Sequence, residues 1–244
     1  MKQERYFEAK ECENIKELLY YSAEKYNDKT AFIIKEKKEN EVKYKNISYK
    51  KLLEDINCYG TKLYDLGYQN KRVAVVGRNR YEWCIAHLSN LLGNMVSIPL
   101  DKELQVDELE SCLVRSKADV VVFDEKYIDN IEEIKKRGNS NLKNYICMSE
   151  YAGYESVPNM IKQGKKLIKA GKKDFINCKI DSYKMSILLF TSGTTSKSKA
   201  VMLSQNNVAS NIYSMQLVED IRPTDVNLAF LPYHHIFGST CMLV

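Results

Sequence analysis

The chain has 244 residues, of which 44% are hydrophobic and 28% are charged, so it can bury a sizeable core and lacks the composition of a disordered protein. Its net charge of +5 is mild, and its basic residues do not alternate with aromatic ones, which argues against a nucleic-acid partner. Seven scattered cysteines without a Cys-x-x-Cys pair argue against a disulfide framework and a structural zinc site.

The chain begins with Met-Lys-Gln-Glu-Arg-Tyr, which has no apolar stretch typical of a secretion signal. No run in the sequence reaches the ~18 apolar residues that a membrane-spanning helix needs. Because scattered, odd-numbered cysteines are typical of a reducing compartment, we expect a cytoplasmic protein.

Apolar runs of strand length alternate along the chain with amphipathic segments of helix length. The expected helices cover residues 13–27, 49–66, 80–92, 106–116, 126–137, 157–171 and 205–218, and a further helix begins near 236. The expected strands lie near residues 30–35, 42–47, 72–77, 95–99, 119–123, 143–148, 186–191, 200–203 and 226–231. This alternation predicts crossover connections and an α/β fold, with a largely parallel sheet covered by helices on both faces.

The helix expected at 157–171 is unusually basic. Its lysines, with two that follow it, are Lys162, Lys165, Lys166, Lys169, Lys172 and Lys173. A solvated helix face, with lysine stems lying over the apolar residues between them, explains this pattern. Peripheral contact with anionic lipid, or with the phosphates of a cofactor, is the alternative.

The strand expected at 186–191 runs into a loop rich in hydroxyl groups. Residues 190–201 read Phe-Thr-Ser-Gly-Thr-Thr-Ser-Lys-Ser-Lys-Ala-Val. Backbone amides in a tight turn, together with a nearby Lys, suit a polyphosphate, and Gly193 permits the positive φ that such turns often need. The loop is not a P-loop, because no second glycine precedes a Lys-Ser/Thr pair. A solvated Ser/Thr turn is the alternative.

This stretch resembles the signature loop of adenylate-forming enzymes, the superfamily of acyl-CoA synthetases, luciferases and peptide-synthetase adenylation domains. The family pattern is Thr-Ser-Gly-Thr-Thr-Gly-x-Pro-Lys-Gly-Val. The chain keeps its first half but has Ser196, Ser198 and Ala200 where the pattern has Gly, Pro and Gly. The resemblance implies that the phosphates of ATP bind to Thr191, Ser192, Gly193, Thr194, Thr195 and Lys199.

A second motif follows the loop. Residues 228–238 form an apolar run that ends in Pro-x-x-His-x-x-Gly, which is similar to the next family motif. The resemblance implies that His235 lines the pocket for the carboxylate and acyl group; a histidine that is merely hydrogen-bonded at a strand end is the alternative. The role of His234 stays open, and His87 is interpreted as structural.

Scaffold segments 47–52, 72–77 and 94–101 extend the resemblance over nearly the whole chain, which looks most like bacterial long-chain fatty-acid–CoA ligases. The resemblance implies the N-terminal part of the large AMP-binding domain. Its divisions are a first sheet-and-helix layer over 1–150, a crossing segment over 151–184 and a phosphate-loop and acyl-pocket segment over 185–244. Because residues 240–244 carry no helix stop signal, we expect the fold to be incomplete there, with the catalytic Lys and the C-terminal domain outside the chain.

By the same resemblance, the parent protein is expected to activate a carboxylate as an acyl-adenylate, with release of pyrophosphate. A long-chain fatty acid is the expected substrate, and aryl, medium-chain and amino acids are the alternatives. Coenzyme A then takes up the acyl group, so ATP, Mg²⁺ and coenzyme A are the expected cofactors, and no metal ligand is assigned to the protein. Residues 1–244 alone are expected to be inactive. The alternative is a non-catalytic nucleotide- or acyl-binding module whose phosphate loop has lost part of its pattern.

Overall fold

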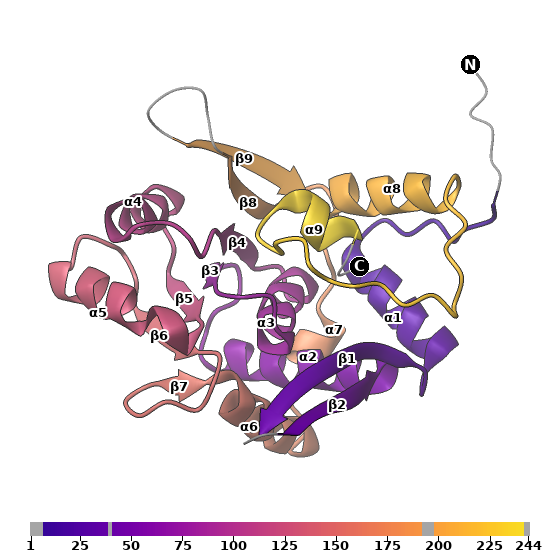
Figure 1. The fold of residues 1–244 in the computed structure, drawn as a ribbon, viewed down its shortest axis with the longest axis horizontal. Helices are drawn as coiled ribbons and strands as arrows, with labels where there is room; N and C mark the ends of the chain where they lie inside the picture. The colour runs from indigo at the N-terminus through magenta and orange to yellow at the C-terminus, as the bar shows by residue number, and fades with distance from the viewer. Residues whose placement is uncertain (1–6, 39–40, 192–197, 242–244) are drawn as a thin grey trace.

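The computed structural model describes residues 7–38, 41–191 and 198–241 (Figure 1). The helices are α1 Ile15–Tyr26, α2 Tyr49–Asp65, α3 Tyr81–Leu92, α4 Val106–Ser116, the 3₁₀ helix η1 Glu125–Tyr127, α5 Ile128–Arg137, α6 Val157–Lys169, α7 Asp174–Asn177, α8 Gln205–Gln216 and α9 Ile236–Cys241. The strands are β1 Thr30–Lys38, β2 Glu41–Ser48, β3 Arg72–Val76, β4 Val96–Leu100, β5 Val120–Phe123, β6 Asn144–Cys147, β7 Glu155–Ser156, β8 Met185–Thr191 and β9 Lys199–Ser204.

The main sheet has the strand order β7-β6-β5-β3-β4-β8-β9. Its strand pairs are parallel except for β8 and β9, which pair antiparallel, and β1 and β2 form a separate antiparallel hairpin. The expected α/β fold is therefore confirmed. From β4 to β7 the order is that of a doubly wound sheet, whose connections change direction between β3 and β5.

Helices cover both faces of this sheet, and the strand sequences reflect it. Along β3, Val73 and Val75 belong to the core cluster that includes α1, α2 and α3, whereas Ala74 and Val76 belong to the cluster under α4 and α5. Because both faces are buried, β3 is a continuous apolar run instead of an alternating one.

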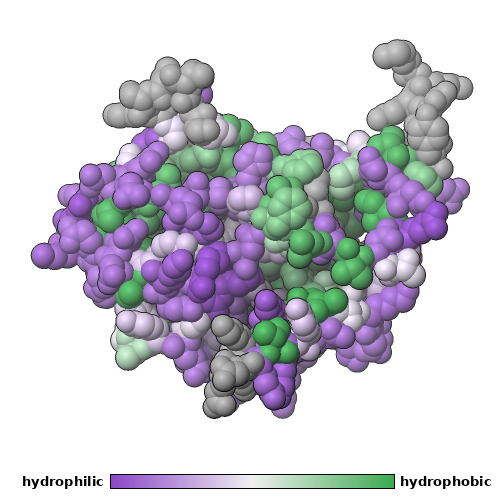
Figure 2. Space-filling view, viewed as in Figure 1, coloured by the Kyte–Doolittle hydropathy of each residue, from purple (hydrophilic) through white to green (hydrophobic). Residues whose placement is uncertain are grey.

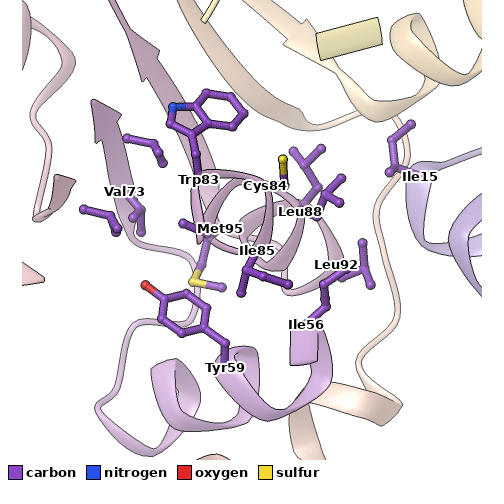
Figure 3. Close-up of a cluster of buried hydrophobic side chains, with 14 of the residues drawn as sticks. Ile15, Ile56, Tyr59, Val73, Trp83, Cys84, Ile85, Leu88, Leu92 and Met95 are labelled. Carbon is purple, nitrogen blue, oxygen red and sulfur yellow. The ribbon is translucent and has the colours of Figure 1, made fainter. Parts of the chain in front are cut away.

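The layer of α2 and α3 is tightly packed. Figure 3 shows Ile56 and Tyr59 of α2 facing Ile85 of α3 and Met95, all of them almost completely buried. On its other side α2 meets α6, where a Cβ atom added to Gly164 would lie 1.8 Å from the carbonyl oxygen of Cys58. Only glycine therefore fits this crossing.

Serine caps fix the start of several helices. Ser48 accepts a hydrogen bond from the backbone of α2, and Ser156 does the same for α6. Ser204 caps α8: its hydroxyl accepts from Asn207 N, and the Asn207 side chain accepts from Ser204 N in return. This reciprocal pair sets the point where β9 ends and α8 begins.

Residues 226–231 do not form the expected strand, so that prediction was wrong. The side chains of Val226, Leu228 and Phe230 are 80%, 78% and 68% exposed, and Figure 2 shows hydrophobic residues gathered over this part of the surface. A strand needs a neighbouring backbone to complete its hydrogen bonds. None lies beside this segment in the described part of the chain, where the side chain of Asn79 binds the carbonyls of Ala229 and Leu231 instead.

Candidate functional site

The hydroxyl-rich loop connects the two strands of the β8–β9 hairpin. Thr191, the last residue of β8, pairs directly with Lys199, the first residue of β9, so the structure brings these two predicted site residues together. Both side chains are exposed. The other predicted phosphate-binding residues, Ser192, Gly193, Thr194 and Thr195, lie outside the described residues, as does Ser196.

Arg115, in the last turn of α4, holds the base of this loop. Its Nη2 donates to the carbonyl of Ser198 at 2.6 Å and its Nη1 to the Ser198 hydroxyl at 3.1 Å. The guanidinium also lies 5.2 Å from the centre of the Phe190 ring. Ser198 stands where the family pattern has Pro, and its hydroxyl gives Arg115 a partner that Pro would lack. No sequence pattern indicates this contact, since the two residues are 83 positions apart.

The loop begins at the carboxyl ends of parallel strands, as expected for a ligand site in such a sheet. β4 and β8 are parallel neighbours, with Ser97 opposite Ile187. Continuing this register brings Asp101, directly after β4, level with Thr191 at the end of β8. The edge beside the loop therefore carries a carboxylate as well as hydroxyl and ammonium groups.

Among the described residues, the Lys199 ammonium has no ion-pair partner. An exposed, unpaired cation beside a loop rich in hydroxyl groups is suited to bind an anion such as a phosphate.

His235 lies just before α9, with an exposed side chain. Its Nδ1 accepts a hydrogen bond from Phe237 N at 3.3 Å, and its carbonyl accepts from Ser239 N at 3.0 Å. No hydrogen bond or ion pair joins it to Thr191 or Lys199 in the described part of the chain. The neighbouring His234 is the residue that reaches the sheet edge, where its Nε2 lies 3.6 Å from Asp101 Oδ2.

His87 is buried away from this edge. Its Nδ1 lies 2.8 Å from the Ser97 hydroxyl, and its ring lies against Trp83, with ring centres 5.0 Å apart. Burial lowers the pKa of His87 to about 4, so it is neutral at pH 7. These contacts agree with a structural role.

The switch point between β3 and β5 is closed by charged side chains. Arg78, after β3, binds both carboxylate oxygens of Asp124, after β5, at 2.6 and 2.7 Å. Burial raises the pKa of Asp124, but hydrogen bonds from Arg78 and from Lys126 N outweigh it and hold that pKa below its usual range. Arg80 binds Glu125 beside this pair at 2.8 Å. The ion pairs brace the sheet where doubly wound sheets often bind ligands.

The basic surface of α6 is partly neutralised by ion pairs. Lys162 binds Glu150 at 3.0 Å, and Lys165 binds Glu54 at 2.7 Å. The apolar face of the same helix packs on α2. These contacts favour the solvated face over a lipid-binding surface. In the described residues, no helix has the length and hydrophobicity that crossing a bilayer requires.

We compared the chain with known protein families. Residues 19–244 match the AMP-binding enzyme family. The chain belongs to this family. The AMP-binding match begins within α1 and includes the loop, Asp101 and His235, so the resemblance seen in the sequence is confirmed.

The relatives of this AMP-binding chain include a long-chain-fatty-acid–CoA ligase 5 from Rattus norvegicus, which is 29% identical over 214 residues, 80% of this chain and 31% of the relative. The chain thus spans about a third of the length of the curated relatives it matches.

Two solved structures share the fold. A long-chain-fatty-acid–CoA ligase from Archaeoglobus fulgidus superposes with a TM-score of 0.80 at 18% identity, over 97% of this chain and 47% of that one. A red-emitting luciferase from Phrixothrix hirtus gives 0.81 at 22% identity, over 99% and 46%.

Proposed function

We propose that the protein carrying this chain is an ATP-dependent acid–CoA ligase, to which residues 1–244 contribute the phosphate-binding hairpin and one wall of the acyl pocket. The observation that carries the proposal is the cross-strand pair of Thr191 and Lys199 at the base of the hydroxyl-rich loop. Family membership and the names of the curated relatives support it.

Phosphate binding is the role we assign to the loop. The Lys199 ammonium would approach the outer phosphates of ATP, while hydroxyls and amides of Thr191, Ser192, Gly193, Thr194 and Thr195 would surround them. These donors lower the negative charge that a carboxylate meets as it approaches ATP. Arg115 would keep the loop base in place through Ser198.

The proposed reaction is an in-line displacement. A carboxylate oxygen forms a bond to the α-phosphorus of ATP, and the bond from that phosphorus to the pyrophosphate oxygen breaks, which gives an acyl-adenylate and pyrophosphate. The thiol of coenzyme A then attacks the acyl carbon, releases AMP and loses its proton to base. The first step depends on positioning and charge stabilisation, which this hairpin suits. His235 would face the carboxylate or the acyl chain.

Mg²⁺ is given no protein ligand in this proposal. Within the described residues, no group of three or more His, Cys, Asp or Glu side chains could hold a metal ion. No step is therefore assigned to the metal.

We propose a long-chain fatty acid as the substrate, because several curated relatives are named as long-chain-fatty-acid–CoA ligases. A cytoplasmic location, with no nucleic-acid partner, and the inactivity of residues 1–244 alone are further parts of the proposal. The three-part division at residues 150 and 184 also stays a prediction.

A second candidate function is a binding module without catalysis. The loop favours it at three positions, Ser196, Ser198 and Ala200, where the family pattern has Gly, Pro and Gly. Such a module would bind ATP or an acyl group but would not release pyrophosphate.

The variant Lys199→Ala tests the assigned loop function. We expect the KM for ATP in acid-dependent pyrophosphate release to rise ~10- to 100-fold, the range that losing one hydrogen bond to a charged group produces. Lys184→Ala is the matched control, since Lys184 is another exposed lysine and lies just before β8. Equal effects of the two variants would refute the loop assignment.

A further inference from the structure

Asn79 makes three hydrogen bonds to a segment 150 or more positions further along the chain. Its Nδ2 donates to the carbonyl of Ala229 at 3.1 Å and to the carbonyl of Leu231 at 2.7 Å. Its Oδ1 accepts from Tyr233 N at 3.1 Å. One amide side chain thus uses both of its donor hydrogens and its acceptor on a single stretch of backbone.

The three bonded residues alternate along the segment. The segment forms no strand, since it bends at Leu231 and turns at Tyr233. Asn79 nevertheless binds the backbone of Ala229, Leu231 and Tyr233 with one side chain and so fixes the path of this irregular stretch. Among the described residues, the backbone of 229–233 is joined to the earlier part of the chain by hydrogen bonds with this side chain alone; the Tyr233 hydroxyl makes a separate hydrogen bond with Cys84.

Tyr233 is also held through its ring. It is buried, and its ring centre lies 5.4 Å from that of Trp83 in α3. Asn79 lies between β3 and α3 and is half-buried, and Trp83, in the first turn of α3, is almost completely buried. The segment is thus fixed to a rigid support at the carboxyl end of β3.

A short and crowded turn connects this support to His235. His235 N donates to the carbonyl of Pro232 at 3.1 Å. A Cβ atom added to Gly238 would lie 2.2 Å from the same carbonyl oxygen, so the start of α9 is pressed against Pro232. A displacement of residues 229–233 would therefore move His235 as well.

We propose that Asn79 is a positioning residue for His235. It sets the path of the 229–233 backbone, and through the Pro232 turn it sets the place from which His235 meets the acid substrate. The functional part of this inference rests on the proposed ligase function. Asn79 itself contacts backbone only, and we assign it no contact with substrate.

Trp83 provides a direct probe of this arrangement, because it is the only tryptophan in the sequence. In Asn79→Ala, release of the segment would uncover the Trp83 ring, so we expect acrylamide to quench its fluorescence more strongly than in the wild type. Asn57→Ala is the matched control: Asn57, in α2, accepts a hydrogen bond from Tyr20, and its side chain makes no hydrogen bond to residues 229–233 in the described part of the chain. Circular dichroism would verify that both variants are folded.

The kinetic arm uses acid-dependent pyrophosphate release by the full-length protein. A misplacement of about 1 Å at a reacting group can cost ~100-fold in rate, so we expect kcat to fall by up to that factor in Asn79→Ala. The KM for ATP should stay unchanged, because the phosphate loop lies on the β8–β9 hairpin, which is separate from residues 229–233. Asn79→Asp, which keeps an acceptor for Tyr233 N but loses both donors, should change kcat in the same direction.

Unchanged quenching of Trp83 in a folded Asn79→Ala variant would show that Asn79 does not hold residues 229–233 in place. If quenching increases but kcat is unchanged, Asn79 does not position His235. The same conclusion follows if quenching increases and the KM for ATP rises while kcat stays the same. Failure of the proposed ligase function would be seen separately, as a wild-type protein that releases no pyrophosphate with any acid.

Discussion

His234 contacts Asp101: the Nε2 atom of the histidine lies 3.6 Å from Oδ2 of the carboxylate. Because Asp101 directly follows β4, this contact joins the residue before His235 to the strand that neighbours β8. Burial is the largest influence on the pKa of His234 and lowers it, and the nearby Asp101 carboxylate raises this pKa. Of the weaker influences, His235 and Lys102 lower the pKa and Glu103 raises it. The adjacent residues Tyr233 and His234 are therefore held by separate contacts: Asn79 binds the backbone of Tyr233, and Asp101 contacts the side chain of His234.

Asp101→Asn should lower the pKa of His234 further, because the carboxylate that stabilises the imidazolium is lost. The pKa can be followed by NMR titration of the imidazole signals, since the chain has only three histidines. Glu103→Gln serves as the control: Glu103 acts in the same direction but is the weakest of the five causes. A His234 pKa that does not move in Asp101→Asn would show that the contact does not form in solution.

The stability of the protein should fall as the pH is lowered from 7 to 5, in part because of His87. Burial lowers the pKa of His87 to about 4, whereas an unfolded histidine titrates near ~6.5. The stability associated with neutral His87 is therefore fully present above pH ~6.5 and is lost as the pH falls, by about 2 kcal/mol at pH 5. Urea unfolding of wild type and His87→Gln at both pH values tests this. The variant should lose less stability between them, and an equal loss would contradict the assignment.

Asp124→Asn should destabilise the fold, because it removes the buried carboxylate that binds Arg78 at two atoms and leaves that arginine only the Glu125 carboxylate at 3.4 Å. We expect a cost of about 3 kcal/mol, at the low end for a buried ion pair because Arg78 is half exposed. The pKa of Asp124 is depressed, so its contribution is present above the unfolded value of ~3.9 and is lost as the pH falls through the folded value. Thermal unfolding at pH 7 measures the effect.

Asp220→Asn is the control for this prediction, since Asp220 pairs with Arg222 at an exposed position. We expect no measurable change in melting temperature for it. A similarly small change in Asp124→Asn would mean that the switch-point pair does not brace the sheet.

Arg115→Lys should weaken ATP binding without destabilising the fold. The planar guanidinium binds both the carbonyl and the hydroxyl of Ser198, which a single ammonium cannot do in the same geometry. We expect the KM for ATP to rise ~10-fold, the equivalent of about 1.4 kcal/mol. Arg222→Lys, at an exposed arginine that pairs with Asp220, is the control. An unchanged KM for ATP would show that the loop does not need this anchor.

Most of the scaffold could be predicted because its determinants are local. The apolar run of β3 and the heptad-like spacing of α4 are each readable within a dozen residues, and helix 106–116 was predicted with its observed bounds. The alternating Val226, Leu228 and Phe230 gave an equally strong local signal for a strand. That signal failed because a strand also needs a partner, which no local pattern can supply.

The candidate site divides in the same way. Thr191 and Lys199 could be recognised because the whole loop is one continuous stretch of sequence. Arg115 and Asn79 could not, because each acts on a segment far along the chain and neither stands in a recognisable motif. Asn79 binds backbone atoms alone, so the residues that it holds need no particular side chain, and Arg115 binds the backbone of Ser198 as well as its hydroxyl.

The most direct test of the proposed function is pyrophosphate release from ATP by the full-length protein, with and without a long-chain fatty acid. We expect pyrophosphate release that depends on the acid, formation of an acyl-CoA when coenzyme A is added, and a weaker affinity for ATP in Lys199→Ala. ATP binding without acid-dependent release of pyrophosphate would contradict the proposed function and would favour the binding module.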